Sequence, residues 1–400
     1  MQLQNSLGTE LVQELIISKK QPTLIAFSSV NCPKGQFKPF KPLIGTEFNV
    51  LFVNDIGNRW YTNGIPNIAD TPLESAEILV EHARKMGNGR VVTFGTSMGA
   101  FGAILYCVLG KADGALGFGL ESPLQAPLTR SLLQVPKTTD LSIKDIKEII
   151  TSRKASLHIF QSDVDEIDMQ TGISLKHLLN VHPISGAEHP SVQQFNDKNL
   201  LYPLLAKFAK SGKIDFPKSF KGTFCSINSI ELLIQAALKR ANGAKDNDIL
   251  ELLQSAVNDS PEAPLPLLRL AELFHRKNNS KEAEARLLKL IKAFPYQSQA
   301  YNKLAAVYLR LEKPELALPL IEKAVNLSPS NAYICHTAGR VYEALNKFKE
   351  AEEAYKSARI INKGNLDFKR SHIKILSKLI ELYTDEVKNI EIEILAKSKK

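Results

Sequence analysis

The stretch Val91-Val92-Thr93-Phe94-Gly95-Thr96-Ser97-Met98-Gly99-Ala100 decides the fold of the first half of the chain. Its apolar start predicts a buried strand, and the small and apolar residues from Ala100 to Leu109 predict a helix. A serine held in the sharp turn between them takes strained backbone angles, so its neighbours must lack bulk. The G-x-S-x-G pattern at Gly95–Gly99 therefore predicts a nucleophile elbow. A glycine-rich loop that packs a helix closely on a sheet would give the same pattern.

Short apolar runs alternate with helical stretches up to about residue 215. Strands are expected at Thr23–Phe27, Val50–Val53, Val91–Phe94, Ala115–Leu120, Leu157–Phe160 and Asn180–Ile184. Helices are expected at Leu73–Met86, Phe101–Leu109, Ile143–Thr151, Gly172–Leu179 and Lys198–Ala209. This alternation predicts an α/β fold with a mostly parallel sheet that is covered on both faces. Ligands of such sheets bind beyond the carboxyl ends of the strands.

Beyond Ile230 a period of 34 residues replaces this alternation. Four classes of position keep the period: Pro261, Pro295 and Pro329; Ala283, Ala317 and Ala351; Phe274, Tyr308 and Tyr342; Ala271, Ala305 and Gly339. The register resembles the tetratricopeptide repeat (TPR), in which small residues let paired helices approach and a proline follows the second helix. The resemblance implies an all-α solenoid.

Composition and charge argue against several classes of function. The 400 residues are enough for two or three domains, and 44% hydrophobic and 23% charged residues are ordinary for a globular protein. The net charge of +9 is dispersed among acidic residues, which argues against nucleic-acid binding. The four cysteines contain no C-x-x-C pair, so neither a zinc site nor a disulfide framework is expected.

No targeting segment, metal site or cofactor site is recognisable in the sequence. The N-terminus lacks the pattern of a signal peptide, and no apolar run approaches the length that spans a bilayer. Together with the scattered cysteines, this predicts a cytoplasmic protein without a transmembrane segment, a metal or a cofactor.

A serine nucleophile needs a base that takes its proton and an acid that orients the base. Acidic residues follow the expected strand that ends at Phe160, and a short polar turn ending in His189 follows the last expected strand. The chain therefore carries serine, acid and histidine in this order, each after the end of a strand.

With these residues in this order, residues 1–215 resemble the α/β-hydrolase superfamily. The resemblance implies that Ser97 is the nucleophile and His189 the general base. It also implies an oxyanion hole made by backbone N–H groups of Met98 and of Ser28 or Ser29, in the loop after the first strand. This loop departs from the family because it lacks a glycine-rich sequence.

The acid is less well defined by the resemblance. Asp165 is our expected acid, because the segment from Ser162 to Asp165 resembles the family's G-x-x-D turn. Ser162 stands where the family has glycine, so Asp163 and Asp168 stay open as alternatives.

The loop from Asp55 to Tyr61 directly follows a strand and holds the single tryptophan of the chain. Asp55, Asn58, Trp60 and Tyr61 would suit a carbohydrate or another polar ligand; alternatively, the two aromatic residues pack the loop onto the sheet. With the elbow and the histidine turn, this loop resembles hydrolase-like proteins of bacterial surface-polysaccharide or glycoprotein-export systems. That resemblance implies an acyl or acetyl ester on a glycan as substrate.

The repeats predict a groove lined by the first helix of each helix pair. The polar groove candidates are Asn302, Lys303, His336 and Arg340, so a protein or peptide partner is expected. A structural role, in which the repeats position or dimerise the first domain, is the alternative.

The sequence thus predicts a two-domain chain. Residues 1–215 form the α/β-hydrolase-like domain and 216–229 a linker, and the repeats occupy 230–263 (degenerate), 264–297, 298–331 and 332–365. Residues 366–400 are expected to form a capping helix and a basic tail. The expected function is that of a serine esterase or deacylase whose repeats recruit a partner. The alternative is a catalytically inactive adaptor with a hydrolase fold that acts as a protein-protein interaction scaffold.

Overall fold

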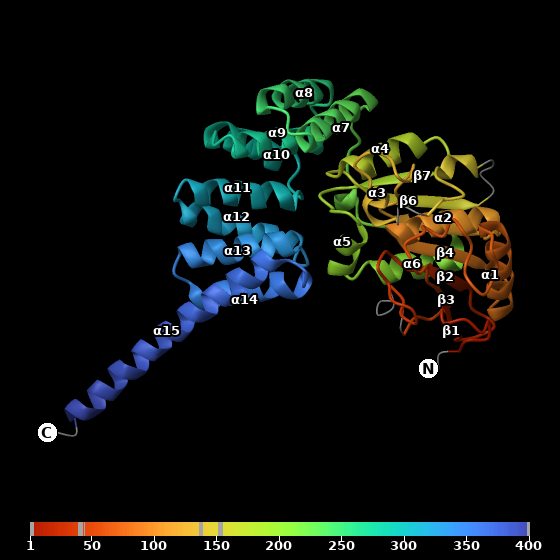
Figure 1. Ribbon diagram of the computed structural model, residues 1–400, viewed down its shortest axis with the longest axis horizontal. Coiled ribbons are helices and arrows are strands. Elements are labelled where there is room, and N and C mark those ends of the chain that lie inside the picture. Colours follow the sequence, from red (N-terminus) through yellow and green to blue (C-terminus); the bar gives the residue numbers. More distant parts are fainter. Residues whose placement is uncertain (1–3, 39–42, 44, 136–138, 151–154, 398–400) are drawn as a thin grey trace. The chain divides into compact units, whose positions relative to one another are not determined.

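The computed structural model describes residues 4–38, 43, 45–135, 139–150 and 155–397 (Figure 1). The chain divides into two compact units, Met1–Pro266 and Leu267–Lys400. The first unit contains an α/β region with a mostly parallel sheet, and the second is a stack of helix pairs. Both features confirm the fold class expected from the two periodicities. The basic end of the tail, 398–400, lies outside the described residues.

A single seven-stranded sheet has the order β1-β3-β2-β4-β5-β6-β7. The strands are β1 (Val12–Leu15), β2 (Thr23–Phe27), β3 (Asn49–Val53), β4 (Val91–Thr96), β5 (Gly114–Phe118), β6 (Ser156–Ser162) and β7 (Asn180–Ile184). All pairs are parallel except β1 with β3, which is antiparallel. Strands β2 to β5 are buried along their whole length, as expected for a sheet covered on both faces.

Strand β1 is an edge strand that the sequence did not predict. Its four residues include Gln13 and Glu14, so it lacks the apolar run that marks the other strands. Glu14 is nevertheless 1% exposed, because its carboxylate accepts the Ser6 N–H at 3.0 Å and pairs with His82 at 3.2 Å. A buried acid is tolerated where such partners replace water.

The helices of the first unit are α1 (Pro72–Met86), α2 (Met98–Leu109), α3 (Arg130–Gln134), α4 (Glu166–Leu175), α5 (Val192–Asp197), α6 (Leu201–Ser211), α7 (Ile227–Ala241) and α8 (Asp246–Asp259). The helix expected at Ile143–Thr151 is a single 3-10 turn at Ile146–Glu148, and its last residue lies outside the described range. The sequence did not predict α3 or α5, which are only five and six residues long.

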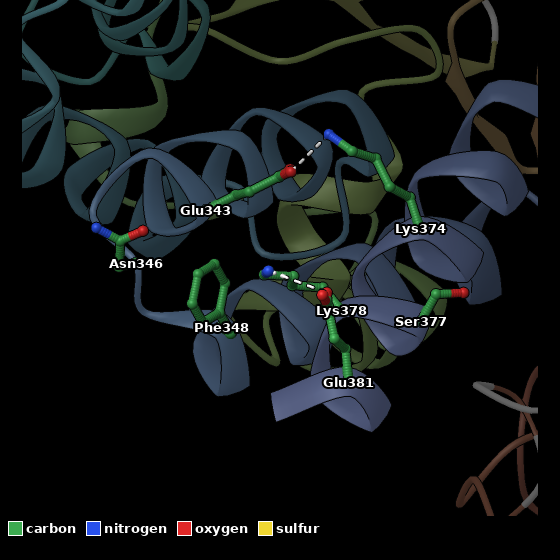
Figure 2. Close-up of a pocket in the computed structure, with 7 residues that line it drawn as sticks. All are labelled: Glu343, Asn346, Phe348, Lys374, Ser377, Lys378 and Glu381. Carbon is green, nitrogen blue, oxygen red and sulfur yellow. Dashed lines mark hydrogen bonds and ion pairs between the residues drawn. The ribbon is translucent and has the colours of Figure 1, made fainter. Parts of the chain in front are cut away.

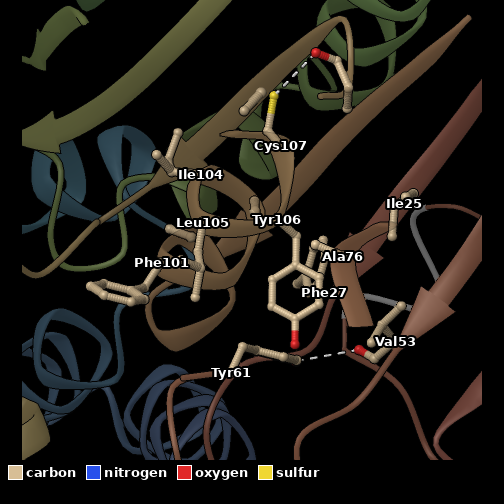
Figure 3. Close-up of a cluster of buried hydrophobic side chains, with 14 of the residues drawn as sticks. Ile25, Phe27, Val53, Tyr61, Ala76, Phe101, Ile104, Leu105, Tyr106 and Cys107 are labelled. Atoms are coloured by element: carbon tan, nitrogen blue, oxygen red, sulfur yellow. Dashed lines mark hydrogen bonds between the residues drawn. The ribbon is translucent and has the colours of Figure 1, made fainter. Parts of the chain in front are cut away.

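A buried aromatic cluster joins α2 to the sheet (Figure 3). The rings of Phe27 and Tyr61 meet edge to face with centroids 5.0 Å apart, and Tyr106 lies 5.1 Å from Phe27. A side chain at Gly102 would lie 2.5 Å from the Tyr61 ring. The glycine in α2 therefore makes the room that Tyr61 fills.

The segment expected as a linker, 216–229, is packed against the sheet. The Phe220 ring lies 5.0 Å from Phe195, and the Phe220 carbonyl accepts the Ser185 N–H at 2.9 Å. The Gly222 N–H donates to the Pro183 carbonyl at 2.8 Å. The compact first unit consequently continues through α7 and α8 to Pro266, past the boundary that the sequence suggested.

Three helix pairs follow, and each begins 34 residues after the one before. They are α9 (Pro264–Arg276) with α10 (Ser280–Ala293), α11 (Ser298–Arg310) with α12 (Pro314–Leu327), and α13 (Ala332–Ala344) with α14 (Phe348–Ile361). The 32-residue helix α15 (Leu366–Lys397) ends the array. Small residues set the packing, since a side chain at Gly339 would lie 2.6 Å from the Tyr355 ring.

The four cysteines, all within the described residues, are buried and form no disulfide. Within the described residues, no helix is both long enough and apolar enough to cross a membrane.

Two half-buried histidines on the last two strands of the sheet make the first unit sensitive to acid. His158 Nδ1 of β6 lies 3.1 Å from His182 Nε2 of β7. Burial lowers the pKa of both imidazoles to about 4, and the charges of His158 and Lys221 add to the effect at His182. Between pH 6.5 and 4 the unfolded chain therefore binds more protons than the folded chain, so stability is lost as the pH falls through this range.

When the pH is lowered from 7.5 to 5, we expect the free energy of unfolding to fall less in the His182→Gln variant than in the parent. The two decreases should differ by about 1 kcal/mol, because the variant lacks one titrating group. Urea unfolding followed by the fluorescence of Trp60 reports the first unit alone, because the chain has one tryptophan. Equal losses in the two proteins would contradict the assignment. The exposed His177, changed to Gln, is the control.

Candidate active site

Ser97 stands at the junction of β4 and α2 in a strained conformation. Its φ is 53° and its ψ is −120°, outside the regions that residues with a side chain prefer. Its N–H donates to the Phe118 carbonyl of the neighbouring strand at 2.8 Å, which anchors the turn. The Ser97 side chain is half-buried at the carboxyl end of the sheet.

The two flanking glycines are required by close backbone contacts. A Cβ on Gly95 would lie 1.9 Å from the Gly99 carbonyl oxygen, and a Cβ on Gly99 would lie 2.3 Å from the Phe27 carbonyl oxygen. Both distances are far below van der Waals contact. The glycine pattern therefore reflects a cramped turn that presses α2 against the end of β2.

Ser97, His189 and Asp168 form a continuous chain of polar contacts. His189 Nε2 lies 3.0 Å from Ser97 Oγ, and His189 Nδ1 lies 2.7 Å from Asp168 Oδ1. An ionised carboxylate only accepts hydrogen bonds, so the imidazole proton belongs on Nδ1 and Nε2 is left to accept the serine proton. Both side chains are sequestered, with 8% of the His189 side chain and none of Asp168 exposed.

The surroundings of Asp168 keep it ionised. Burial by itself would raise the pKa of Asp168, but the charges and hydrogen bonds of His189, Arg130 and the Ser162 N–H together lower it below the ordinary value. The Ser162 N–H donates to Asp168 Oδ2 at 3.0 Å. The buried carboxylate is thus available to orient the imidazole and to stabilise its protonated form.

The acid that contacts His189 is Asp168 and not the expected Asp165. Asp165 is the N-cap of α4, where its Oδ1 accepts the N–H groups of Ile167 and Asp168, while its Oδ2 pairs with Arg130 at 2.5 Å. Asp163, the other alternative, accepts the Gly186 N–H at 2.8 Å. Asp165 caps the N-terminus of α4. Asp168 therefore lies about one helical turn further along and faces the histidine.

Glu121 and Arg130 support the candidate site, and neither residue was predicted from the sequence. The buried Glu121 carboxylate accepts the N–H groups of Arg130 and Ser131 at 2.7 and 2.8 Å, which fixes the start of α3. From there Arg130 Nη1 lies 3.7 Å from Asp168 Oδ1. No sequence motif marks this pair, because Glu121 and Arg130 meet through a loop.

Gly119 makes room for the histidine ring. Its φ is +66°, and a Cβ there would lie 2.8 Å from His189 Cε1 and Nδ1. The neighbouring Leu120 is held by the Gln161 side chain, which accepts the Leu120 N–H at 2.9 Å and donates to the Leu120 carbonyl at 2.7 Å. The end of β5 is therefore shaped around His189.

The structure separates the two alternatives for the second oxyanion donor. The Ser28 N–H donates to the Val53 carbonyl at 2.9 Å, so it is not available to bind an oxyanion. Among the described residues, none accepts the N–H of Ser29 or of Met98. Met98 is the first residue of α2, where the N–H has no acceptor within the helix. Met98 and Ser29 are thus the remaining candidate donors.

The Asp55 loop does not present a binding platform. Trp60 and Tyr61 are 1% and 0% exposed, so the two rings pack the loop onto the sheet. The Tyr61 hydroxyl donates to the Ser28 carbonyl at 2.8 Å, and Asp55 accepts the Tyr61 N–H at 2.9 Å. Asn58 donates to Asn31 at 2.9 Å and so joins two loops. Of the two alternatives for Trp60 and Tyr61, their burial agrees with packing onto the sheet and not with stacking on a carbohydrate.

The four groove candidates in the repeats have different environments. Lys303 pairs with Glu272 of α9 at 3.1 Å, and Arg340 is exposed. His336 is half-buried, with its Nε2 2.9 Å from Ser371 Oγ of α15 and its ring 5.3 Å from Tyr355. The side-chain carbonyl oxygen of Asn302 is buried and has no partner among the described residues. The assignment of these four residues to a groove stays a prediction.

Comparisons with known proteins match the repeats. Residues 232–376 match the family described as "Tetratricopeptide repeat-like domain". Cellulose synthase operon protein C of Pseudomonas fluorescens (strain SBW25) is 28% identical over 132 residues, which are 32% of this chain and 10% of that protein. The match thus spans about a tenth of the length of this curated relative.

Two solved structures are also similar to part of this chain. MamA 41-end from Desulfovibrio magneticus RS-1 is 18% identical, with a TM-score of 0.33, and the match covers 40% of this chain and 98% of that chain. A thermophilic TPR protein of Thermus thermophilus is 20% identical, with a TM-score of 0.35, covering 38% of this chain and 82% of that chain. The family match over residues 232–376 shows that the C-terminal half of the chain contains a TPR-like domain.

Proposed function

We propose that the first unit is a serine hydrolase of the α/β-hydrolase type that cleaves an acyl ester, and that the repeats hold a protein or peptide partner. One observation carries the hydrolase proposal: the contacts at 3.0 and 2.7 Å that link Ser97 Oγ through the His189 ring to the Asp168 carboxylate. A serine hydroxyl in a strained turn has little structural use for a histidine that is itself oriented by a buried acid.

In the proposed reaction, Ser97 Oγ attacks the acyl carbonyl carbon while its proton passes to His189 Nε2. Asp168 stabilises the imidazolium that forms. The negative charge on the carbonyl oxygen is met by the N–H groups of Met98 and Ser29. Collapse of this intermediate breaks the bond to the leaving alkoxide, which takes the proton from His189.

Water then completes the cycle. His189 Nε2 removes a proton from the water, whose oxygen attacks the acyl carbon of the acyl-enzyme. The bond to Ser97 Oγ breaks, the serine regains its proton from His189, and the acid product leaves. The chain supplies every proton acceptor and donor for both halves of this reaction.

The acyl group and the alcohol are left open by this proposal. The buried Trp60 and Tyr61 remove the reason to expect a glycan, because neither ring is available for stacking. The exposed Leu132 and Leu133 of α3 lie on the helix that also carries Arg130. An apolar acyl chain is therefore the substrate type that we would test first.

The repeats favour a partner with acidic groups. Burial, and then the charges of Arg310, Lys303 and Arg340, lowers the pKa of His275 to about 4, so these three cations gather near one residue. Glu272 offsets part of this charge through its pairs with Arg269 and Lys303. Cations on successive first helices form a groove that suits an extended acidic peptide.

The second candidate function is a scaffold in which the first unit is catalytically inactive. The comparisons favour it, because the family match covers residues 232–376 and lies in the repeats. One feature of the site agrees with it: Arg130 lies 3.7 Å from Asp168 and competes with His189 for that carboxylate.

A fluorophosphonate probe tests the hydrolase proposal directly. We expect the folded parent chain to be labelled on Ser97, and the Ser97→Ala variant to lose the label completely. The control is Ser211→Ala, which removes an exposed hydroxyl at the end of α6 and should keep the label. A parent chain that stays unlabelled while its Trp60 fluorescence shows a folded first unit would favour the scaffold.

The identity of the acid is tested by two conservative variants. Asp168→Asn should lower the rate of ester hydrolysis by about 10³-fold or more, because the amide cannot hold the imidazole in the required tautomer. Asp165→Asn should change that rate by less than about tenfold while lowering the stability of α4 by about 1 kcal/mol, because it alters an N-cap. The reverse order of rates would return the role to Asp165.

Gly119→Ala tests whether the placement of the His189 ring matters. The added methyl group would lie 2.8 Å from the ring, so the imidazole must turn away from Ser97. We expect slower probe labelling, by about 10²-fold, as for a misplaced catalytic group. Gly89→Ala, at a positive φ with no atom near the new methyl group, is the matched control and should label normally. Equal labelling of both variants would contradict the role of Gly119.

A further inference from the structure

Helix α15 extends well past the repeats that hold its start. Phe368, His372 and Ile375 are buried against the last repeat, and Lys349 of α14 lies 5.8 Å from the Tyr383 ring. From Thr384 onward every described side chain of the helix is exposed. An isolated helix of this length is marginal in water unless an apolar face is covered.

An uninterrupted heptad stripe runs along α15 from Ile373 into the exposed part. Apolar residues alternate at spacings of three and four: Ile373, Leu376, Ile380, Tyr383, Val387, Ile390 and Ile394. Each of them is between 38 and 66% exposed. The first, third, fifth and seventh residues, which occupy the a positions, are all β-branched. This spacing and these residue types are typical of a two-stranded coiled coil.

The stripe lies on a different face from the one that packs on the repeats. At 100° per residue, the stripe is turned on average by roughly a quarter of a circle from the face that contains Phe368, His372 and Ile375. On the other flank, Lys374 pairs with Glu343 of α13 at 2.7 Å beside an open pocket of about 500 Å³ (Figure 2). These contacts hold the first turns of the helix, and apart from the Lys349 contact with Tyr383 they involve no residue of the stripe.

The sequence of α15 does not favour packing of a further repeat against the exposed part of the helix. The face that packs on α14 continues through Leu382 to Glu386, Asn389 and Glu393, and therefore becomes polar. The stripe, in contrast, stays apolar as far as Ile394. Toward the end of α15, the apolar residues therefore lie on the face that carries the stripe and no longer on the face that packs on α14.

We propose that the α15 stripe pairs with the same stripe of a second copy of this chain, as an antiparallel two-stranded coiled coil. The charge along the helix selects this occupant and this direction. Residues 366–378 carry four basic residues and one acid, a net +3, whereas residues 379–397 carry five acids and two lysines, a net −3. Antiparallel pairing sets each basic half against the acidic half of the other copy.

The register follows from the stripe. In the antiparallel pair, Ile373 packs on Ile390 of the second copy, Leu376 on Val387, and Ile380 on Tyr383. Arg370, at a flanking position, then faces Glu391 of the second copy. A parallel pair would instead set Glu386 beside Glu391, and two acids at such flanking positions repel each other.

The mass of the full chain in solution tests the pairing. Light scattering coupled to gel filtration at about 50 µM should give twice the chain mass of 44.4 kDa. The double variant I380D/V387D should elute as a monomer with its repeats still helical by circular dichroism. The matched control is I392D, an equally exposed isoleucine off the stripe, which should remain dimeric. A monomeric parent, or an I392D variant that dissociates as well, would overturn the proposal.

Disulfide trapping tests the direction. The native cysteines are buried, so introduced surface cysteines report alone. A mixture of I373C and I390C chains should cross-link under mild oxidation, whereas I390C chains alone should not. Rapid cross-linking of I390C with itself would show parallel pairing and overturn the antiparallel assignment.

Discussion

The close approach of the α2 backbone to the end of β2 is the constraint on which the candidate site depends. The Phe27 carbonyl and the Gly99 backbone leave no room for a side chain at position 99. Two residues earlier, the turn holds Ser97 at a strained φ of 53°. The close approach also brings the loop that contains Ser29 beside the first N–H groups of α2. The serine and both candidate oxyanion donors therefore lie next to one close backbone contact.

Regular periodicity explains how much of the fold could be predicted from the sequence. Strands β2 to β5 and the helix pairs repeat an apolar pattern that reports burial directly. Strand β1 could not be predicted because Glu14 is buried by partners that are distant in the sequence. The segment around Phe220 looked like a linker because its aromatic residues have no period, and only the folded sheet shows what they contact.

The candidate site, too, could be predicted from the sequence only in part. Ser97 and His189 could be named because their motifs and order are local properties of the chain. The acid could not, because Asp165 and Asp168 are three residues apart and only the start of α4 decides which one faces the histidine. Trp60 posed the same difficulty, since its burial depends on contacts made by the rest of the sheet. Sequence order thus selects the segment, and helix capping and packing select the residue.

Helix α15 separates self-association from the other proposed functions. The stripe from Ile373 to Ile394 shares no residue with the groove cations or with Ser97, so the three proposals rest on different residues. An assembly of two chains would then carry two grooves and two serine sites. A partner with two acidic segments could bind both grooves at once, and its second contact would be favoured by a high effective concentration. Self-association would in this way strengthen partner binding without any new contact in the groove.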